Sequence, residues 1–377
     1  MRAPPNPALR VERCEASALT TIVEEWRSLA ARALEPNVFY EPAFMLAAAP
    51  VFGADLRVAL VRTAGGRLVG LFPSRIARPL GSPWRMVTGW THPYGPLGTP
   101  LIDREDSASI VAAWLDHLAQ DRAVPGLLLM PLIPERGAFA AALDSVLAHG
   151  GHANAVFDRH RRALLDPGVE RGDYLARAVS AGRRKELRRQ RRRLSDAAPI
   201  AFTTARDTND IAAALQDFLT LEAAGWKGRA GTAAASDPAI ATFIRNAVDG
   251  LAAHGKARVD RMLSDGRAIA ATITLASGDT AWCWKIAYDE SLSRASPGVQ
   301  LVCELTESLL AQDGPARVDS CAVADHPMID HLWRERLALG DRLIALRPAA
   351  GRFTLACRME RTRRSAVALL KAMRNRI

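Results

Sequence analysis

The sequence predicts an α+β protein of two domains, each a sheet covered by helices on both faces. The chain has 377 residues, more than one hydrophobic core usually organises. Helical and strand-like periodicities alternate along it, and the second half contains three successive strand patterns joined by short turns. We therefore expect mixed, largely antiparallel sheets in an N-terminal domain (1–165) and a C-terminal domain (166–377), divided at Asp166-Pro167-Gly168.

The composition is that of an ordinary globular protein, with 49% hydrophobic and 24% charged residues. The sequence contains no apolar stretch long enough for a signal peptide or a membrane span, so we expect a cytoplasmic location. Five cysteines are scattered without a CxxC pair or a histidine at ligand spacing. This pattern predicts reduced thiols, with neither disulfides nor a metal site.

The first half alternates helix and strand patterns. Helical patterns cover 17–33, 108–120 and 136–148, and strand patterns cover 56–61, 68–76, 126–132 and 153–165. A short apolar segment surrounds Phe44. The segment 79–100 is rich in proline, glycine and tryptophan, which predicts an irregular loop. It is either a plain connection or a substrate-facing loop, in which Trp90, His92 and Tyr94 are the candidate substrate-binding residues.

The second half repeats a similar order, which indicates an internal duplication. The expected strands are 200–204, 256–263, 267–275, 282–288, 316–321 and 342–347, and the expected helices are 209–224, 238–253, 299–312, 328–338 and 359–376. The dipeptide Asp265-Gly266 is a strong hairpin signal between two of these strands.

The segment 281–301 has the pattern of a cofactor site. The strand pattern Trp282–Tyr288 is followed by a polar turn, and Ser296-Pro297-Gly298 then begins a helix. The start of a helix carries unpaired backbone N–H groups and the positive end of the helix dipole. It can therefore hold the phosphates of a nucleotide-like cofactor.

The net charge of +10 is concentrated in one predicted helix, residues 183–194. The segment Arg183–Arg193 holds eight basic residues and one acidic residue. It is either a solvated surface helix or a site for an anionic partner, namely a phosphate group, an acidic membrane surface or tRNA. Arginine predominates, which favours bidentate contacts with phosphate, and the lack of aromatic residues argues against base stacking.

Several motifs in the second half resemble those of GNAT-type acyltransferases of the CelD-like, cellulose-biosynthesis-associated family. They are EAAGWKGRAGTA (222–233), DGRAIA (265–270), WKIAYD (284–289), SPG (296–298) and DSCAVADHPMIDHLW (319–333). The resemblance covers roughly 174–347 well and the N-terminal half more loosely. It implies two GNAT-like three-layer α/β/α domains, the first degenerate, as in the Fem-type aminoacyl transferases.

The same resemblance implies a donor and its binding residues. The donor would be acetyl-CoA or another acyl-CoA, lying along the strand 282–288 and held by the backbone of Ile286, Ala287 and Tyr288. Its pyrophosphate would meet Arg294, Ser296, Gly298 and Val299. Many GNAT enzymes have a more glycine-rich turn there, so an aminoacyl-tRNA donor stays open. The acceptor would be an envelope polysaccharide precursor, a glycolipid or a related small molecule.

Direct acyl transfer requires a base for the nucleophile and an acid for the leaving thiolate. The candidate bases are Glu222, Asp319, Asp325 and His326, and the candidate acid is Tyr288. Trp226 and Lys227 are expected to shape the acceptor cleft.

Two further expectations concern the neighbouring residues and the alternative function. Strand alternation predicts that Lys285 points to the opposite face from Trp284. No histidine is placed to activate Cys321 as a nucleophile. The alternative function is a non-catalytic polyanion-binding protein that uses the arginine-rich helix.

Overall fold

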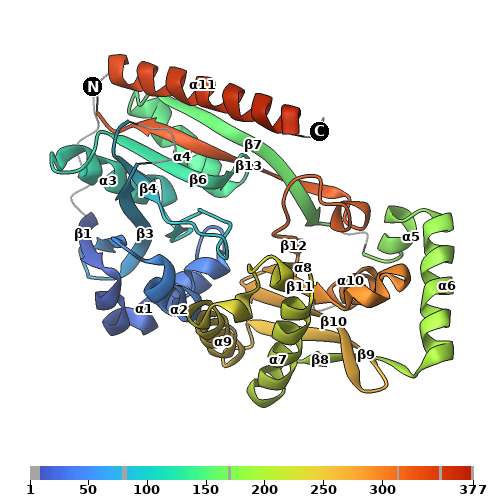
Figure 1. The fold of residues 1–377 in the computed structure, drawn as a ribbon. Helices are drawn as coiled ribbons and strands as arrows, with labels where there is room; N and C mark the ends of the chain where they lie inside the picture. Colours follow the sequence, from blue (N-terminus) through green and yellow to red (C-terminus); the bar gives the residue numbers. More distant parts are fainter. Residues whose placement is uncertain (1–8, 79–82, 169–170, 312–313, 348–349, 375–377) are drawn as a thin grey trace. The chain divides into compact units, whose positions relative to one another are not determined.

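The computed structural model describes residues 9–78, 83–168, 171–311, 314–347 and 350–374 (Figure 1). The chain forms two compact units, each built from segments that are separate in the sequence. Unit 1 comprises Met1–Asn37, Gly53–Arg159 and Ala338–Ile377, and unit 2 comprises Val38–Phe52 and His160–Leu337. The sequence predicted one division, at residues 165 and 166. The structure also assigns an early segment to unit 2 and the last segment to unit 1.

Unit 1 is a sheet in which β4 pairs parallel with β6, while β2 pairs antiparallel with β1 and β3, β3 with β4 and β6 with β13. Its strands, in spatial order, are β1 (Leu9–Glu15), β2 (Arg57–Thr63), β3 (Leu68–Ala77), β4 (Met86–Gly89), β6 (Leu127–Pro134), β13 (Glu335–Ala345) and the first part of β7 (Asn154–Leu165), with β5 (Leu101–Ile102) beside β3. The helices are α1 (Val23–Ala31), α3 (Ser107–Gln120), α4 (Ala138–His149) and α11 (Ala350–Arg374). Helices α3 and α4 bury one continuous apolar cluster with the sheet.

Unit 2 has a similar order of elements around its own strands. Its strands, in spatial order, are the second part of β7, β12 (Arg317–Asp319), β11 (Thr280–Tyr288), β10 (Arg267–Ser277), β9 (Ala257–Ser264) and β8 (Ile200–Ala205). The helices are α2 (Pro42–Phe52), α5 (Tyr174–Ala178), α6 (Ala181–Ala197), α7 (Thr208–Ala224), α8 (Trp226–Arg229), α9 (Pro238–Ala252) and α10 (Pro297–Leu309). The predicted class of mixed, largely antiparallel sheets is confirmed.

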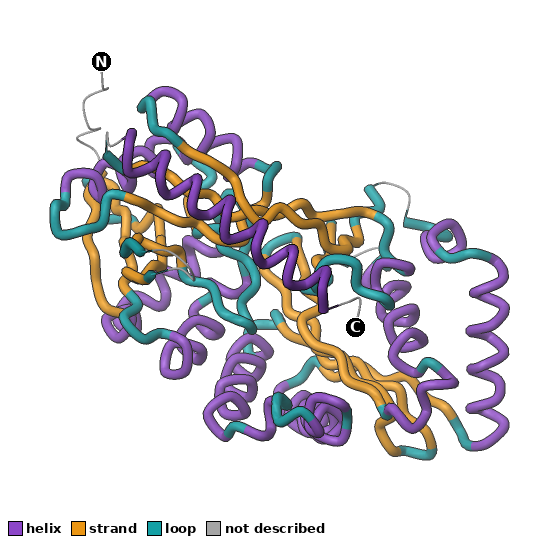
Figure 2. Tube along the Cα trace, turned by 45° about the horizontal axis from the view of Figure 1, so that its top comes forward, coloured by secondary structure: helices purple, strands orange, loops and turns teal. Residues whose placement is uncertain are grey.

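The helices of unit 2 lie on both faces of its sheet. Trp284 of β11 packs edge-to-face against Phe44 of α2 and Phe243 of α9. Its neighbour Cys283 belongs instead to the apolar cluster that contains Val302 and Leu305 of α10. Figure 1 shows α6 along the outer side of this unit, beside α5 and α10, and the tube view of Figure 2 shows the strands as one layer with helices around them.

Helix α2 is an early segment that completes the core of unit 2. Phe44 is fully buried, with its ring centroid 5.2 Å from Phe39 and 5.4 Å from Phe243. Just before the helix, the buried carboxylate of Glu41 accepts hydrogen bonds from Lys256 Nζ and Ser277 Oγ, both at 2.6 Å. A paired buried carboxylate and an aromatic cluster thus fix this segment to strands far along the chain.

Most expected elements are present within a few residues, and the predicted helix 328–338 is wrong. Only a short 3-10 turn, Ile329–His331, forms there, and β13 begins at Glu335. Residues 335–338 begin this strand, and Ala338 O accepts the backbone N–H of Glu135 at 2.9 Å. Sheet hydrogen bonds over a long sequence distance thus replace the end of the expected helix. The sequence also gave no signal for β1, and it identified α2 only as a short apolar segment.

We expect Phe44→Ala to lower the free energy of unfolding of unit 2 by about 3–5 kcal/mol, because it leaves a cavity among three aromatic rings. Urea unfolding of the full chain measures this. Leu355→Ala, on the exposed side of α11, is the matched control and should cost less than about 1 kcal/mol. A loss below about 1 kcal/mol for Phe44→Ala would show that α2 is not part of this core.

Candidate active site

Strands β11 and β12 run parallel and separate early. They pair only through Thr280–Trp282 and Arg317–Asp319, although β11 continues to Tyr288. From residue 283 onward β11 keeps β10 as its partner on one side. On the other side, in the described part of the chain, no strand pairs with β11 beyond Trp282. Backbone groups at such an edge can pair with an extended ligand.

The end of β12 is fixed by a buried ion pair. Asp319 is 2% exposed and accepts a hydrogen bond from the guanidinium of Arg162, on β7, which is equally buried. The other carboxylate oxygen accepts the backbone N–H of Cys321 at 2.9 Å, and Cys321 has a left-handed backbone with φ of 53°. The chain therefore turns away from β11 directly after Asp319.

A β-bulge in β11 changes which way Lys285 points. In the pairing with β10, Ile273 opposes Lys285 and Thr274 opposes Cys283, so Trp284 is the extra residue. The expectation that Trp284 and Lys285 point to opposite faces is wrong. The Lys285 ammonium lies 5.8 Å from the Trp284 ring centroid, because the bulge shifts the alternation by one position.

Lys285 faces a charged pair at the end of α7. Glu222, which is 6% exposed, accepts Lys227 Nζ at 2.6 Å and the backbone N–H of Ala234 at 2.8 Å. Burial, together with the charge of Lys227, lowers the pKa of Lys285 to about 8, and the Glu222 carboxylate acts in the opposite direction. Sequence reasoning did not include Lys285 among the site residues, because a bulge leaves no signal in the sequence.

The other predicted bases lie just beyond β12. Asp325 is exposed and has a left-handed backbone with φ of 56°. His326 Nδ1 accepts the backbone N–H of Met328 at 3.2 Å, and burial lowers the pKa of His326. An Nδ1 that accepts a hydrogen bond leaves the proton of the neutral ring on Nε2. His326 thus caps the following turn.

The predicted phosphate-binding turn leads from β11 into α10. Ser296 adopts a left-handed conformation (φ 51°, ψ 49°), which glycine usually supplies, and Pro297 is the first helical residue. Gly298 lies against Tyr288, since a Cβ there would approach the Tyr288 ring to 3.0 Å. Arg294 is exposed on the short 3-10 segment Glu290–Ala295. The N–H groups of Gly298 and Val299 start the helix beside the end of β11.

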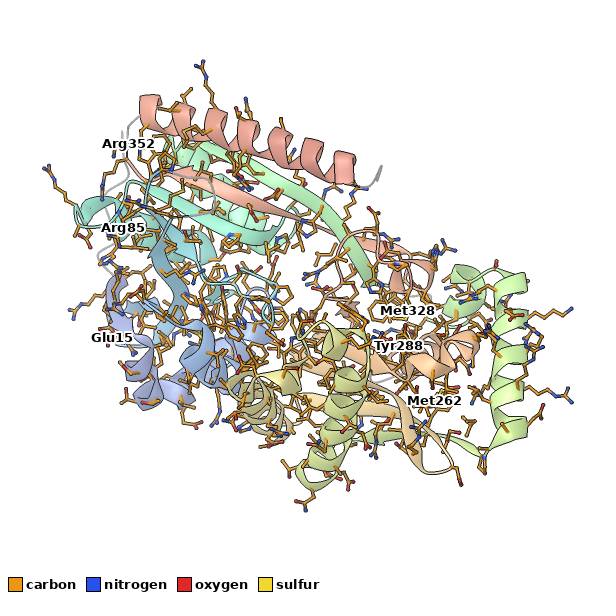
Figure 3. All side chains as sticks on the ribbon, viewed as in Figure 1. Glu15, Arg85, Met262, Tyr288, Met328 and Arg352 are labelled. Carbon is orange, nitrogen blue, oxygen red and sulfur yellow. The ribbon has the colours of Figure 1, made fainter. Side chains whose placement is uncertain are left out.

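Several exposed apolar side chains follow or end the elements around β11 and β12. Tyr288, which ends β11, is 37% exposed, and Val323, which follows β12, is 72% exposed. Trp226 is 60% exposed, and its backbone N–H donates to Glu290 Oε1 at 2.7 Å, two residues beyond Tyr288. Figure 3 labels Tyr288 at the end of β11. Large exposed apolar side chains mark binding surfaces, and Val323 was not predicted.

The loop residues Trp90, His92 and Tyr94 belong to unit 1. Trp90 is 1% exposed and its ring lies 4.8 Å from that of His92, while His92 and Tyr94 are partly exposed.

In unit 1, the parallel strands β4 and β6 correspond to β11 and β12 of unit 2, and the space beside β6 is filled by the chain itself. Gly98 donates its N–H to Leu132 O at 3.2 Å, and a Cβ at Gly98 would lie 2.0 Å from the Pro131 carbonyl oxygen.

The thiols near the gap are protonated and poor nucleophiles. Burial, followed by the charge of Asp319, raises the pKa of Cys321 well above its ordinary value, and burial raises that of Cys283 to about 11. Within the described ranges, no three His, Cys, Asp or Glu side chains are grouped so that they could hold a metal ion. None of the helices that the structure describes combines the length and the apolar character needed to cross a membrane.

Comparisons with known proteins agree with this geometry. Residues 181–326 match the family model described as "Acetyltransferase (GNAT) domain". No curated protein matches the chain. Among solved structures, that of FemX has a TM-score of 0.56 at 10% identity, covering 89% of this chain and 97% of that one.

Two further solved structures share the fold over most of their lengths. The C-terminal domain of a putative lysylphosphatidylglycerol synthetase from Agrobacterium fabrum has a TM-score of 0.55 at 12% identity, with 89% and 94% coverage. A conserved Bacteroides thetaiotaomicron protein of unknown function has a TM-score of 0.54 at 12% identity, with 87% and 97% coverage. At these identities the likeness concerns the fold alone.

The order of elements and the early separation of β11 from β12 define a mixed, largely antiparallel α/β fold, which the chain shares with these solved structures. Residues 181–326, which include β11, β12 and α10, are the part that matches the GNAT acetyltransferase model. The chain is accordingly an enzyme of the acyltransferase class.

The lowered pKa of Lys285 predicts a pH-dependent stability difference. Between pH 8 and the ordinary lysine pKa of 10.5, the unfolded chain binds more protons at this position than the folded chain. The lysine therefore destabilises the fold below pH 8, and the penalty is relieved as the pH rises. Lys285→Met should be more stable than wild type at pH 7, with a difference that shrinks toward pH 10.

Urea unfolding at several pH values measures this difference. Lys185→Met, at an exposed position on α6, is the matched control and should follow wild type at every pH. If the difference in unfolding free energy between wild type and Lys285→Met stayed constant from pH 7 to pH 10, the lowered pKa of Lys285 would be contradicted.

Proposed function

We propose that the chain is an acyl-CoA-dependent N- or O-acyltransferase that transfers acetyl, or another acyl group, directly to its acceptor in a ternary complex. The observation that carries this proposal is the gap between β11 and β12, which opens after three paired residues and leads into the start of α10. Such a gap offers both a strand edge for the amides of pantetheine and a helix start for phosphates.

The donor is held by backbone groups along β11 and by the turn that follows. Ile286, Ala287 and Tyr288 present the strand edge to the pantetheine arm. The N–H groups of Gly298 and Val299, with Ser296 at the turn, receive the pyrophosphate. Arg294, which is exposed beside this turn, supplies a positive charge to the pyrophosphate. One glycine suffices in this turn because Ser296 itself takes the left-handed conformation.

We assign the base to Lys285. Asp319 is held by Arg162, Glu222 is held by Lys227, and His326 caps a turn. Lys285, with a pKa of about 8, loses its proton at mildly alkaline pH, and its neutral amine can then accept a proton. The acceptor's nitrogen or oxygen attacks the thioester carbon, the carbon–sulfur bond breaks, and the acceptor's proton passes to Lys285. Tyr288 donates a proton to the leaving thiolate. Glu222 positions Lys227 beside Lys285.

The acceptor enters beside α8, where Trp226 offers an exposed aromatic face and Lys227 a cation. Aromatic faces stack on sugar rings, and the motifs of the chain resemble those of the CelD-like family. We therefore infer an envelope polysaccharide precursor, a glycolipid or a related small molecule as acceptor. An aminoacyl-tRNA donor is the second candidate, which the fold shared with FemX favours.

The direct test is release of thiol from acetyl-CoA in the presence of a panel of amines and sugar derivatives. We expect turnover with at least one acceptor, and its loss in Lys285→Met. The proposal would be contradicted if the protein neither bound nor turned over any of a range of acyl-CoA compounds. If it then transferred an aminoacyl group from charged tRNA, the donor would be an aminoacyl-tRNA.

We expect Arg294→Glu to weaken binding of acetyl-CoA by about tenfold or more, because it reverses a charge beside the pyrophosphate. The same variant should bind S-acetylpantetheine, which lacks the pyrophosphate, as wild type does. Calorimetry or a thermal shift measures both. Arg206→Glu, after β8 at the other end of the sheet, is the charge-matched control. Equal losses for both ligands would place the pyrophosphate elsewhere.

A further inference from the structure

A second cavity of unit 2 lies between α5, α6 and α10, on the arginine-rich helix. Its volume is about 610 Å³. It is lined by three arginines, two acidic residues and a group of apolar side chains, among them Arg184, Arg188, Leu187, Cys303 and Leu310. The acyl-transfer mechanism uses none of its residues. The lining combines charged and apolar side chains.

Two arginines one helical turn apart form its charged edge. Arg184 and Arg188 project from α6, which begins at Ala181 with its Ser180 cap. The Nε of Arg184 is buried and has no hydrogen-bond partner among the described residues. The acids that line the same cavity are Asp173 and Glu307, and burial, followed by the charge of Glu304, raises the pKa of Glu307. Neither acid forms an ion pair with Arg184 or Arg188 among the described residues.

The inner wall of the cavity is apolar. Leu175 and Val179 from the α5 region, Leu187 of α6 and Leu310 after α10 contribute hydrocarbon surface. A ligand that fills this cavity must carry an apolar chain as well as a negative group, because a polynucleotide would leave the hydrocarbon surface uncovered. The two requirements together describe a phospholipid.

The rest of α6 fits a negatively charged surface around such a ligand. Arg189 pairs with Glu186, and Arg191 pairs with Glu304. Six other basic residues of α6 form no ion pair among the described residues: Arg183, Arg184, Lys185, Arg188, Arg192 and Arg193. Figure 3 shows side chains tipped with nitrogen projecting outward from this helix. Basic surfaces of this kind gain about 1 kcal/mol per residue near anionic lipid.

We propose that the cavity between α5, α6 and α10 binds an anionic glycerophospholipid of a membrane surface. Arg184 and Arg188 hold its phosphate, and an acyl chain lies against Leu187 and Leu310. The remaining basic residues of α6 face the surrounding headgroups. This proposal is independent of the acyl-transfer proposal, because its site uses none of the residues assigned to the donor or the acceptor.

The test is binding of the full chain to vesicles of phosphatidylcholine containing phosphatidylglycerol at about one part in three. We expect binding that is lost without phosphatidylglycerol. The double variant Arg184→Glu, Arg188→Glu should bind at least about tenfold more weakly. The double variant Arg192→Glu, Arg193→Glu carries the same charge change outside the cavity and should lose clearly less. Equal losses in the two variants would contradict a site in the cavity.

A soluble lipid distinguishes binding in the cavity from general electrostatic attraction to a membrane surface. Monomeric dihexanoylphosphatidylglycerol should raise the melting temperature of wild type and of the Arg192, Arg193 variant, but not that of the Arg184, Arg188 variant. Glycerol 3-phosphate, which lacks acyl chains, should have no effect. A rise with glycerol 3-phosphate, or tRNA binding with the same dependence on Arg184 and Arg188, would overturn the proposal. Unchanged thiol release from acetyl-CoA in both variants confirms that the donor site is intact.

Discussion

The buried ion pair between Arg162 and Asp319 is the constraint on which the site depends. It joins β7 to the last residue of β12, and with the N–H of Cys321 it turns the chain away from β11. Without that turn, β12 would continue along β11 and occupy the edge at which we place the donor. Removing either partner would leave a charge buried without compensation, which costs about 3–5 kcal/mol. The pair therefore shapes the site, although its carboxylate does not react.

The two units show how one order of elements gives an open site in one case and a closed one in the other. In unit 2 the edge of β11 beyond Trp282 has no strand beside it in the described part of the chain. In unit 1 the parallel pair β4 and β6 is also short, joined at Val87–Leu128 and Thr88–Leu129. There the segment around Gly98 bonds to Leu132 and fills the corresponding space. The open edge in unit 2 and the filled space in unit 1 support a single acyl-transfer site, in unit 2.

The sequence predicted the layered class, the meander and the turn into α10, because these are set by local periodicity and by residues such as Asp265-Gly266 and Pro297. It did not predict what depends on long-range pairing. Only the last four residues of the helix expected at 328–338 belong to β13, whose following residues pair with β6. The role of Lys285 depends on a bulge opposite Ile273 and Thr274, and no residue type marks a bulge. Helix α2 belongs to unit 2 because Glu41 and Phe44 contact residues more than 190 positions later in the chain.

The central claim is that an acyl donor lies along the free edge of β11, with its phosphates at the start of α10. Hydrogen–deuterium exchange of the full chain with and without acetyl-CoA tests it most directly. We expect slower exchange of the backbone amides in 283–288 and at 298–299, and no change in α6 or in unit 1. Protection by acetyl-CoA confined to α6 or to unit 1, with none along β11, would contradict the claim.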